Sequence, residues 1–190
     1  MSGVRTSKGV ALPVLNLLIR AHIAWFLWEV MTHQDDPRFA GKAIPIRNLV
    51  IVGGMSMLFP LVQLLQKRWP RYPWGWDALY LSVYWLDMAG NSFDLYDSYT
   101  HFDLIPHLHG TGAFTLVFQK AFGLSSRQGF LVANGAHGAL EAQEILTDVF
   151  FKTHNVRGWR DSALDMAVGI LGSLAYPALA RRAFSRERRV

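Results

Sequence analysis

The feature that most constrains this chain is an uncharged run from Asn48 to Gln66, NLVIVGGMSMLFPLVQLLQ. Its nineteen residues match the length that a helix needs to cross roughly 30 Å of hydrocarbon. Pro60 and the pair Gly53–Gly54 would weaken a helix in water. Both residue types are nevertheless common in membrane helices. The run therefore predicts a transmembrane helix.

Five further apolar segments extend this prediction to an all-α, polytopic integral membrane helix bundle of about six transmembrane helices. Charged residues make up 17% of the chain, against about 25% in soluble domains, which favours the membrane class. We expect one helical domain over residues 1–190. A five-helix arrangement stays open because the third and fourth predicted spans are polar at one end. The predicted spans are 13–31, 48–66, 76–91, 104–123, 128–151 and 162–180.

The distribution of Lys and Arg predicts the orientation of these helices. The side that carries both termini holds about twice as many basic residues as the opposite side, which places the termini in the cytoplasm. Trp69, Trp74 and Trp76 suit the cytoplasmic interface. The net charge of +5 then serves orientation and contacts with anionic lipids rather than nucleic acid. We expect a multi-pass protein of the bacterial cytoplasmic membrane with membrane lipids as partners.

A second feature is a concentration of metal-ligand side chains between Asn91 and Gly112, NSFDLYDSYTHFDLIPHLHGTG. Carboxylate oxygen and imidazole nitrogen together form the ligand set of hard or borderline divalent metals. The chain has no Cys, which excludes thiolate nucleophiles and Cys-type zinc sites. The alternative is an acidic loop that only meets water. The ligand-type residues of the stretch are Asp94, Asp97, His101, Asp103, His107 and His109.

On the predicted topology, the acids of four helices gather in the outer half of the membrane. Asp103 and His107 are four residues apart, so they lie on one helical face. His137, Glu141, Glu144 and Asp148 form a single stripe on the fifth span, and Asp165 follows in the sixth. Burying a carboxylate in a bilayer costs several kcal/mol unless it is paired, hydrated or metal-bound. The pattern predicts one shared cavity.

Neutralising this cavity requires more positive charge than the spans contain. Arg20 lies within the first predicted span, and one arginine cannot balance the cluster. A divalent metal ion, or two, could balance it. The predicted metal ligands are Asp94, Asp97, Asp103, His107, His109, Glu144 and Asp165, and the predicted general acid–base residues are His137 and Glu141.

Each of these assignments has a structural alternative. Glu141 and Glu144 could form hydrogen bonds between helices, and His137 could be a buried, hydrogen-bonded imidazole. Asp161 could cap the N-terminus of the last helix. His109 lies two residues after His107, which turns the two rings about 200° apart on a regular helix. They share one metal only if the chain bends.

Missing motifs narrow the chemistry further. The seven His residues include no adjacent pair of the kind that membrane diiron oxygenases use. The chain also lacks the Glu-x-x-His motif of carboxylate-bridged diiron bundles. It contains no HExxH motif, phosphate-binding P-loop or serine nucleophile elbow.

The spacing Asp103-x3-His107, Glu141-x2-Glu144 and Asp161-x3-Asp165-Met166 resembles that of the bacterial YjdF-like inner-membrane proteins. More remotely, it is similar to the VanZ-like family. The likeness covers about the last hundred residues. It implies a small polytopic membrane protein whose acids and His face one cavity, with His107, Glu141, Glu144 and Asp165 as the carried-over positions. The chain departs from the pattern at Leu108-His109 and at Val168.

Two functions follow from these observations. The first is a metal-dependent hydrolase or transferase that acts on a lipid or lipid-linked substrate at the outer leaflet. The alternative is a non-catalytic membrane module, either an ion- or proton-coupled carrier or a lipid-binding envelope protein. The acids gather at one end of the predicted spans, whereas a carrier needs polar groups along a path to both faces. This asymmetry favours the enzyme.

Overall fold

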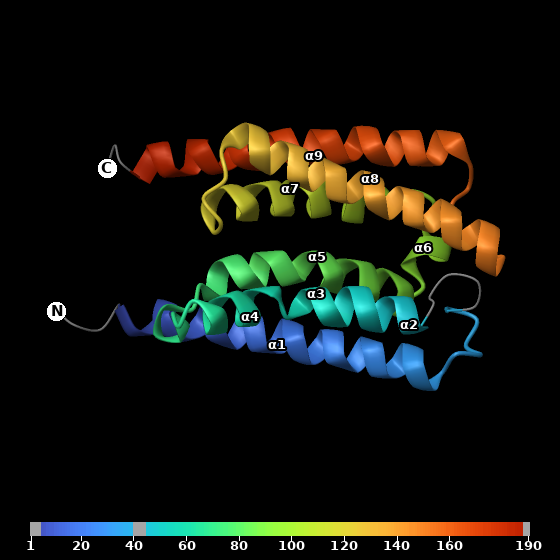
Figure 1. The fold of residues 1–190 in the computed structure, drawn as a ribbon, viewed down its shortest axis with the longest axis horizontal. Helices are drawn as coiled ribbons and strands as arrows, with labels where there is room; N and C mark the ends of the chain where they lie inside the picture. The colour runs from blue at the N-terminus through green and yellow to red at the C-terminus, as the bar shows by residue number, and fades with distance from the viewer. Residues whose placement is uncertain (1–4, 40–44, 188–190) are drawn as a thin grey trace. The chain divides into compact units, whose positions relative to one another are not determined.

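The chain is helical, as the sequence predicts. A computed structural model describes residues 5–39 and 45–187, and within these ranges every regular element is a helix (Figure 1). The all-α prediction is therefore confirmed. The helices fall into two compact units, Met1–Leu95 and Tyr96–Val190, which we call unit 1 and unit 2. Whether the two units form the single predicted domain over residues 1–190 depends on how they associate, so the single-domain statement stays a prediction.

Unit 1 is built around two long helices, α1 (Arg5–Thr32) and α5 (Trp74–Ser92), which pack against each other. Figure 1 shows the shorter helices beside them. These are α2 (Pro45–Asn48), the π-helix η1 (Leu49–Gly53), α3 (Gly54–Ser56), α4 (Leu58–Leu65) and the 3₁₀ turn η2 (Trp69–Arg71).

The uncharged run 48–66 is helical but not one regular helix. It begins in a π-helix at Leu49–Gly53 and is interrupted again at Met57. Pro60 has no N–H, so the carbonyl of Ser56 receives no helical hydrogen bond from it. The guanidinium of Arg20 donates to that carbonyl at 2.8 Å. The helical state of the run is confirmed, and its passage through a membrane stays a prediction. The break near Met57 coincides with the donor that Pro60 lacks, and the Arg20 bond to the Ser56 carbonyl replaces that donor.

Arg20 is also half of a buried ion pair that joins α1 to α5. Its Nη2 lies 2.6 Å from Oδ2 of Asp77, a side chain with no solvent exposure. The same oxygen accepts from Asn16 Nδ2 at 2.8 Å and from the Tyr72 hydroxyl at 2.5 Å. Arg20 is thus committed to unit 1. Asp77 is a buried carboxylate that the sequence reasoning passed over.

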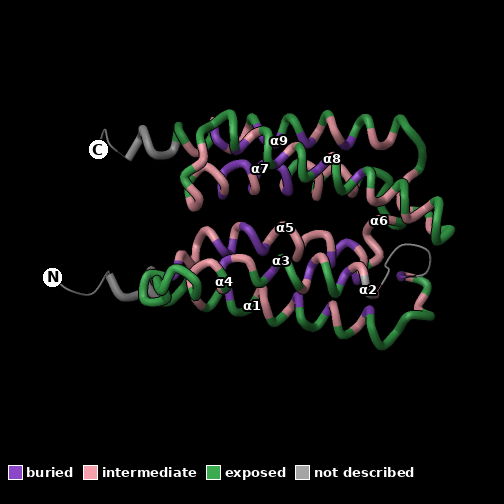
Figure 2. The backbone as a smooth tube through the Cα atoms, in the orientation of Figure 1, coloured by how far each residue is buried: buried purple, intermediate pink, exposed green. Residues whose placement is uncertain are grey.

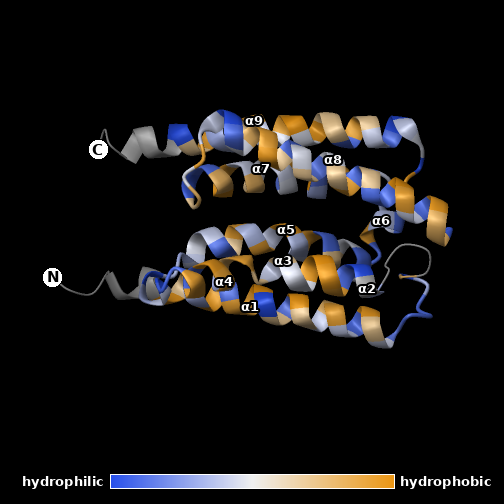
Figure 3. Ribbon diagram, viewed as in Figure 1, coloured by the Kyte–Doolittle hydropathy of each residue, from blue (hydrophilic) through white to orange (hydrophobic). Residues whose placement is uncertain are grey.

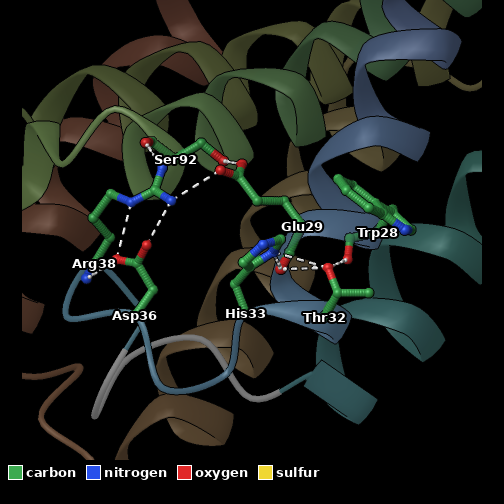
Figure 4. Close-up of polar contacts among 7 residues, drawn as sticks. All are labelled: Trp28, Glu29, Thr32, His33, Asp36, Arg38 and Ser92. Carbon is green, nitrogen blue, oxygen red and sulfur yellow. Dashed lines mark hydrogen bonds and ion pairs between the residues drawn. The ribbon is translucent and has the colours of Figure 1, made fainter.

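A second polar cluster fixes the chain after α1 against the end of α5 (Figure 4). The guanidinium of Arg38 pairs with Asp36 at 2.7 Å and with Glu29 at 2.9 Å. It also donates to the backbone carbonyl of Ser92 at 2.7 Å, and the Ser92 hydroxyl donates to Glu29. One arginine therefore holds residues 33–39 against the last turn of α5, where that carbonyl has no helical partner.

This cluster predicts an acid-sensitive contribution to the stability of unit 1. Hydrogen bonds from Arg38 lower the pKa of Asp36 from 3.8 to about 2. A lowered carboxyl pKa stabilises the fold above the unfolded pKa, and that stability is lost as the pH falls towards 2. We expect the difference in melting temperature between the native chain and Asp36→Asn to shrink from pH 5 to about pH 2. A constant difference would contradict this linkage.

Unit 2 is a bundle of three long helices, α7 (Leu104–Lys120), α8 (Ser126–Phe151) and α9 (Trp159–Glu187), and the short α6 (Leu95–Ser98) lies at its boundary. Ser125 and Gln128 form a capping box that starts α8. At its other end, Lys152 adopts the left-handed conformation, and Asp148 accepts hydrogen bonds from Thr153, Asn155 and Val156. These contacts stop α8 and turn the chain towards α9.

Two helices in the described part of the chain are long and apolar enough to cross a membrane, over Val10–Thr32 and Trp159–Arg182. They coincide with the first and last predicted spans. The predicted spans 76–91, 104–123 and 128–151 coincide with α5, α7 and α8. Their helical state is confirmed, and their passage through a membrane stays a prediction.

Candidate metal centre

The centre depends on close packing of α7 against α9, the most extensive helix contact in unit 2. Gly172 lies directly against the backbone carbonyl of Leu108, so a Cβ at this position would overlap that oxygen. The Thr111 hydroxyl donates to the carbonyl of Gly169 at 2.6 Å. Small residues let two backbones approach this closely. The approach brings the start of α9 beside the first turns of α7.

Asp103, His107 and Asp165 meet at this junction. Asp103 directly precedes α7, and its Oδ1 lies 3.3 Å from Nε2 of His107, one helical turn on. Oδ1 of Asp165, from α9, lies 3.9 Å from the same nitrogen. These three residues offer ligand atoms that all lie within 4.8 Å of one another. We call them the carboxylate group.

The other ring nitrogen of His107 faces α8. Its Nδ1 shares a 2.7 Å hydrogen bond with Nε2 of His137 and lies 3.7 Å from Oε1 of Glu141. His137 is therefore a buried, hydrogen-bonded imidazole, as the structural alternative predicted. His137 and Glu141 are one helical turn apart, with their facing atoms 3.4 Å from each other. These residues also satisfy the 4.8 Å criterion as a set. We call His107, His137 and Glu141 the histidine group.

The burial of these side chains fits a bound cation. His137 and Glu141 are each 6% exposed and Asp165 is 4% exposed. The Glu141 Oε1 atom is buried, and its contacts with ring nitrogens of His137 and His107, at 3.4 and 3.7 Å, are longer than ordinary hydrogen bonds. Leaving a buried polar group unpaired costs about 1–3 kcal/mol, and more when it is charged. Four of the separations, 3.3–3.9 Å, lie near the roughly 3.3 Å between adjacent ligands of a tetrahedral zinc ion. The 2.7 Å between His107 Nδ1 and His137 Nε2 is instead a hydrogen-bond distance.

The carboxylate and histidine groups contain some of the predicted site residues and leave out others. The structure brings together Asp103, His107, His137, Glu141 and Asp165. Among the described residues, the two groups leave out Asp94, Asp97, His109 and Glu144, whose metal-binding role stays a prediction.

The residues left out have other positions. His109 turns away from His107 and shares a 2.8 Å hydrogen bond with the Tyr176 hydroxyl, as expected of residues two apart on a regular helix. Asp97 lies in α6 and Glu144 lies on α8, one turn beyond Glu141. Asp94 belongs to unit 1. His137 and Glu141, predicted as acid–base residues, lie among the ligand-type side chains.

Sequence reasoning missed the residues that shape the centre without contributing a ligand. A Cβ on Gly169 would overlap Nδ1 of His137, and a Cβ on Gly112 would lie 2.5 Å from the Tyr176 ring. The signal in the sequence was the spacing of small residues on α7 and α9, which is typical of closely packed membrane helices. That spacing does not reveal which helix is the partner.

Comparisons with protein-family models, with curated proteins and with solved structures give no match to this chain. The resemblance to the YjdF-like and VanZ-like families therefore stays a prediction. Functional reasoning rests on the geometry of the centre and on its surroundings.

Proposed function

We propose that this chain is a metal-dependent membrane enzyme, a hydrolase or transferase that acts on a lipid or lipid-linked substrate. One observation carries the proposal. Three helices of unit 2 bring two imidazoles and three carboxylates to ligand distances, and three of these five side chains are buried. Buried ionisable groups of this kind concentrate at functional sites.

The distribution of apolar side chains supports a membrane location. Large apolar side chains face outwards on α1 and α9, including Leu18 and Leu171 at 62% and 59% exposure. The exposed stretches of these helices in Figure 2 include the strongly hydrophobic stretches in Figure 3. Asp77, Glu141 and Asp165 are buried instead. A soluble protein arranges its residues the other way round, whereas a bilayer accommodates this pattern. We propose that the remaining predicted spans also cross the membrane.

The chain's own residues suit a hydrolytic or transfer centre. Asp103, His107 and Asp165 supply three ligand positions, the number that leaves a catalytic zinc ion one open position for water or substrate. A bound divalent cation supplies Lewis acidity and lowers the pKa of a water molecule. The Asp103 side chain is 24% exposed, so the carboxylate group is more accessible than the histidine group. A lipid headgroup could reach it from the interface.

The alternative, an ion- or proton-coupled carrier, gains support from a second observation. Neutral polar groups continue inside unit 2 beyond the histidine group. Asn134 Nδ2 donates to the Ser173 hydroxyl at 3.1 Å, and Thr115 and Ser173 are 0% and 2% exposed. The Thr115 hydroxyl is buried without a described hydrogen-bond partner. These groups could line a hydrated path. The sequence analysis favoured the enzyme because the acids gather at one end of the predicted spans, and such a path weakens that preference.

The first test is elemental analysis of the full chain purified in detergent without chelators. We expect at least one equivalent of a divalent metal in the native protein and none in His107→Ala, because both ligand groups contain His107. His22→Gln is the matched control. It changes a histidine of unit 1 whose Nδ1 accepts a hydrogen bond from Trp85 at 2.7 Å, and it should keep the metal. A native protein without metal would overturn the proposed centre.

Activity is then tested by comparing cells that carry the native chain with cells that carry His107→Ala. An enzyme should leave a lipid or lipid-linked species that accumulates only with the variant. Metal-loaded proteoliposomes test the alternative, because a carrier should move the cation or protons across the vesicle membrane. If the lipids are unchanged and the flux depends on His107, the carrier function would replace the enzyme function as the proposal.

A further inference from the structure

We infer that the centre binds two divalent cations, bridged by the imidazole ring of His107. This inference rests on the proposed metal centre and adds a second site to it. The Nε2 atom faces Asp103 and Asp165 at 3.3 and 3.9 Å. The Nδ1 atom faces His137 at 2.7 Å and Glu141 at 3.7 Å. Each nitrogen therefore has its own set of partners.

One ion cannot serve both sets. The two ring nitrogens of an imidazole direct their lone pairs away from each other, so a cation held by Nε2 is out of reach of Nδ1. With metal–nitrogen bonds of about 2.0–2.1 Å, two bridged ions would lie roughly 6 Å apart. With a single cation in the carboxylate group, the ring nitrogens of His137 and His107 would lie 3.4 and 3.7 Å from the buried Glu141 Oε1, which is longer than an ordinary hydrogen bond. A second cation in the histidine group would give that oxygen a direct bond.

Charge balance also favours two ions. Asp103, Asp165 and Glu141 together carry three negative charges when ionised. One divalent cation supplies two positive charges, which leaves a net negative charge among these buried side chains, where uncompensated charge is costly. A second cation removes that deficit. Arg20 cannot supply the difference because it pairs with Asp77 in unit 1.

The separation assigns different roles to the two ions. Catalytic two-metal sites hold their ions about 3.5–4 Å apart so that both contact one reacting oxygen. Ions roughly 6 Å apart on a shared imidazole cannot do so. The histidine group is the more buried of the two, so its ion orients and polarises His107. The ion in the carboxylate group meets the substrate. His137 and Glu141 then act as ligands instead of the acid–base pair predicted from the sequence.

The test is the zinc stoichiometry of single-site variants of the detergent-purified full chain, measured after zinc loading and removal of free metal. We expect two equivalents in the native protein and in His22→Gln, whose histidine lies in unit 1. Glu141→Gln and Asp165→Asn should each retain one, and His107→Ala none. One equivalent in the native protein that survives Glu141→Gln but not Asp165→Asn would overturn the second cation and leave the proposed centre standing. No zinc in any sample would overturn both.

Copper gives a readout of the bridge itself. Two Cu²⁺ ions on one imidazole couple magnetically, so the native protein loaded with two equivalents should give a weaker EPR signal per copper than Glu141→Gln loaded with one. Circular dichroism confirms that each variant is folded. Two equivalents of uncoupled copper in the native protein would overturn the bridging role of His107.

Discussion

Asp77→Ala should lower the free energy of unfolding by about 3–5 kcal/mol, the usual result of removing one partner of a buried ion pair. Asp77 has no solvent exposure, and its Oδ2 accepts bonds from Asn16, Arg20 and Tyr72. The substitution leaves the charge of Arg20, which is 19% exposed, without a counter-ion. Denaturant unfolding in detergent, followed by tryptophan fluorescence, measures the loss, since Trp74 and Trp76 directly precede this position.

A double-mutant cycle separates the ion pair from general damage. Arg20→Met should also destabilise unit 1, and the double variant Arg20→Met/Asp77→Leu should lose less than the sum of the two single changes. Replacing both partners of a buried pair by apolar residues is often nearly neutral. A loss below about 1 kcal/mol for Asp77→Ala, typical of exposed ion pairs, or strictly additive losses would show that the pair does not hold α1 against α5.

The sequence was sufficient to predict the positions of the long helices. Apolar runs with polar breaks predict several ends to within a few residues, as for α8, expected at 128–151 and observed at Ser126–Phe151. The predicted spans 13–31 and 162–180 are too short, because α1 begins at Arg5 and α9 ends at Glu187, outside the apolar runs. The irregular segment around Leu49–Gly53 was not predictable. An uncharged run has no polar–apolar periodicity that would distinguish a π-helix from an α-helix.

The candidate site was predictable where its ligands share one helix face. The pairs Asp103–His107 and His137–Glu141 follow from spacing of four residues alone. The convergence of α7, α8 and α9 around His107 was predicted only indirectly. Burying several carboxylates in a bilayer is costly, so the sequence analysis expected them to share one cavity. The exact partners depend on the close approach at Gly172, which has no ligand-type side chain. Asp77 was missed because its partners, Asn16 and Arg20, lie about sixty residues earlier in the sequence.

Gly172→Ala should have the largest effect on unit 2. The added Cβ would overlap the backbone carbonyl of Leu108, and a helix backbone cannot turn aside as a flexible side chain can. The helices α7 and α9 must therefore separate, at a cost of about 1–3 kcal/mol for overpacking. Asp165 moves with α9, away from His107. We expect the free energy of unfolding to fall and the zinc Kd to rise at least tenfold, measured by thermal unfolding and competition with a chelator.

Two other glycines make the origin of this effect testable. Gly135 on α8 has nothing within 4 Å of an added Cβ, so Gly135→Ala should be neutral or slightly stabilising through helix propensity. Gly169→Ala overlaps only the ring of His137 and the methyl of Thr111. It should weaken zinc in the histidine group with less loss of stability than Gly172→Ala. If Gly172→Ala matched Gly135→Ala in both measurements, α7 and α9 would not meet at Leu108, and the convergence of ligands on His107 would have no structural basis.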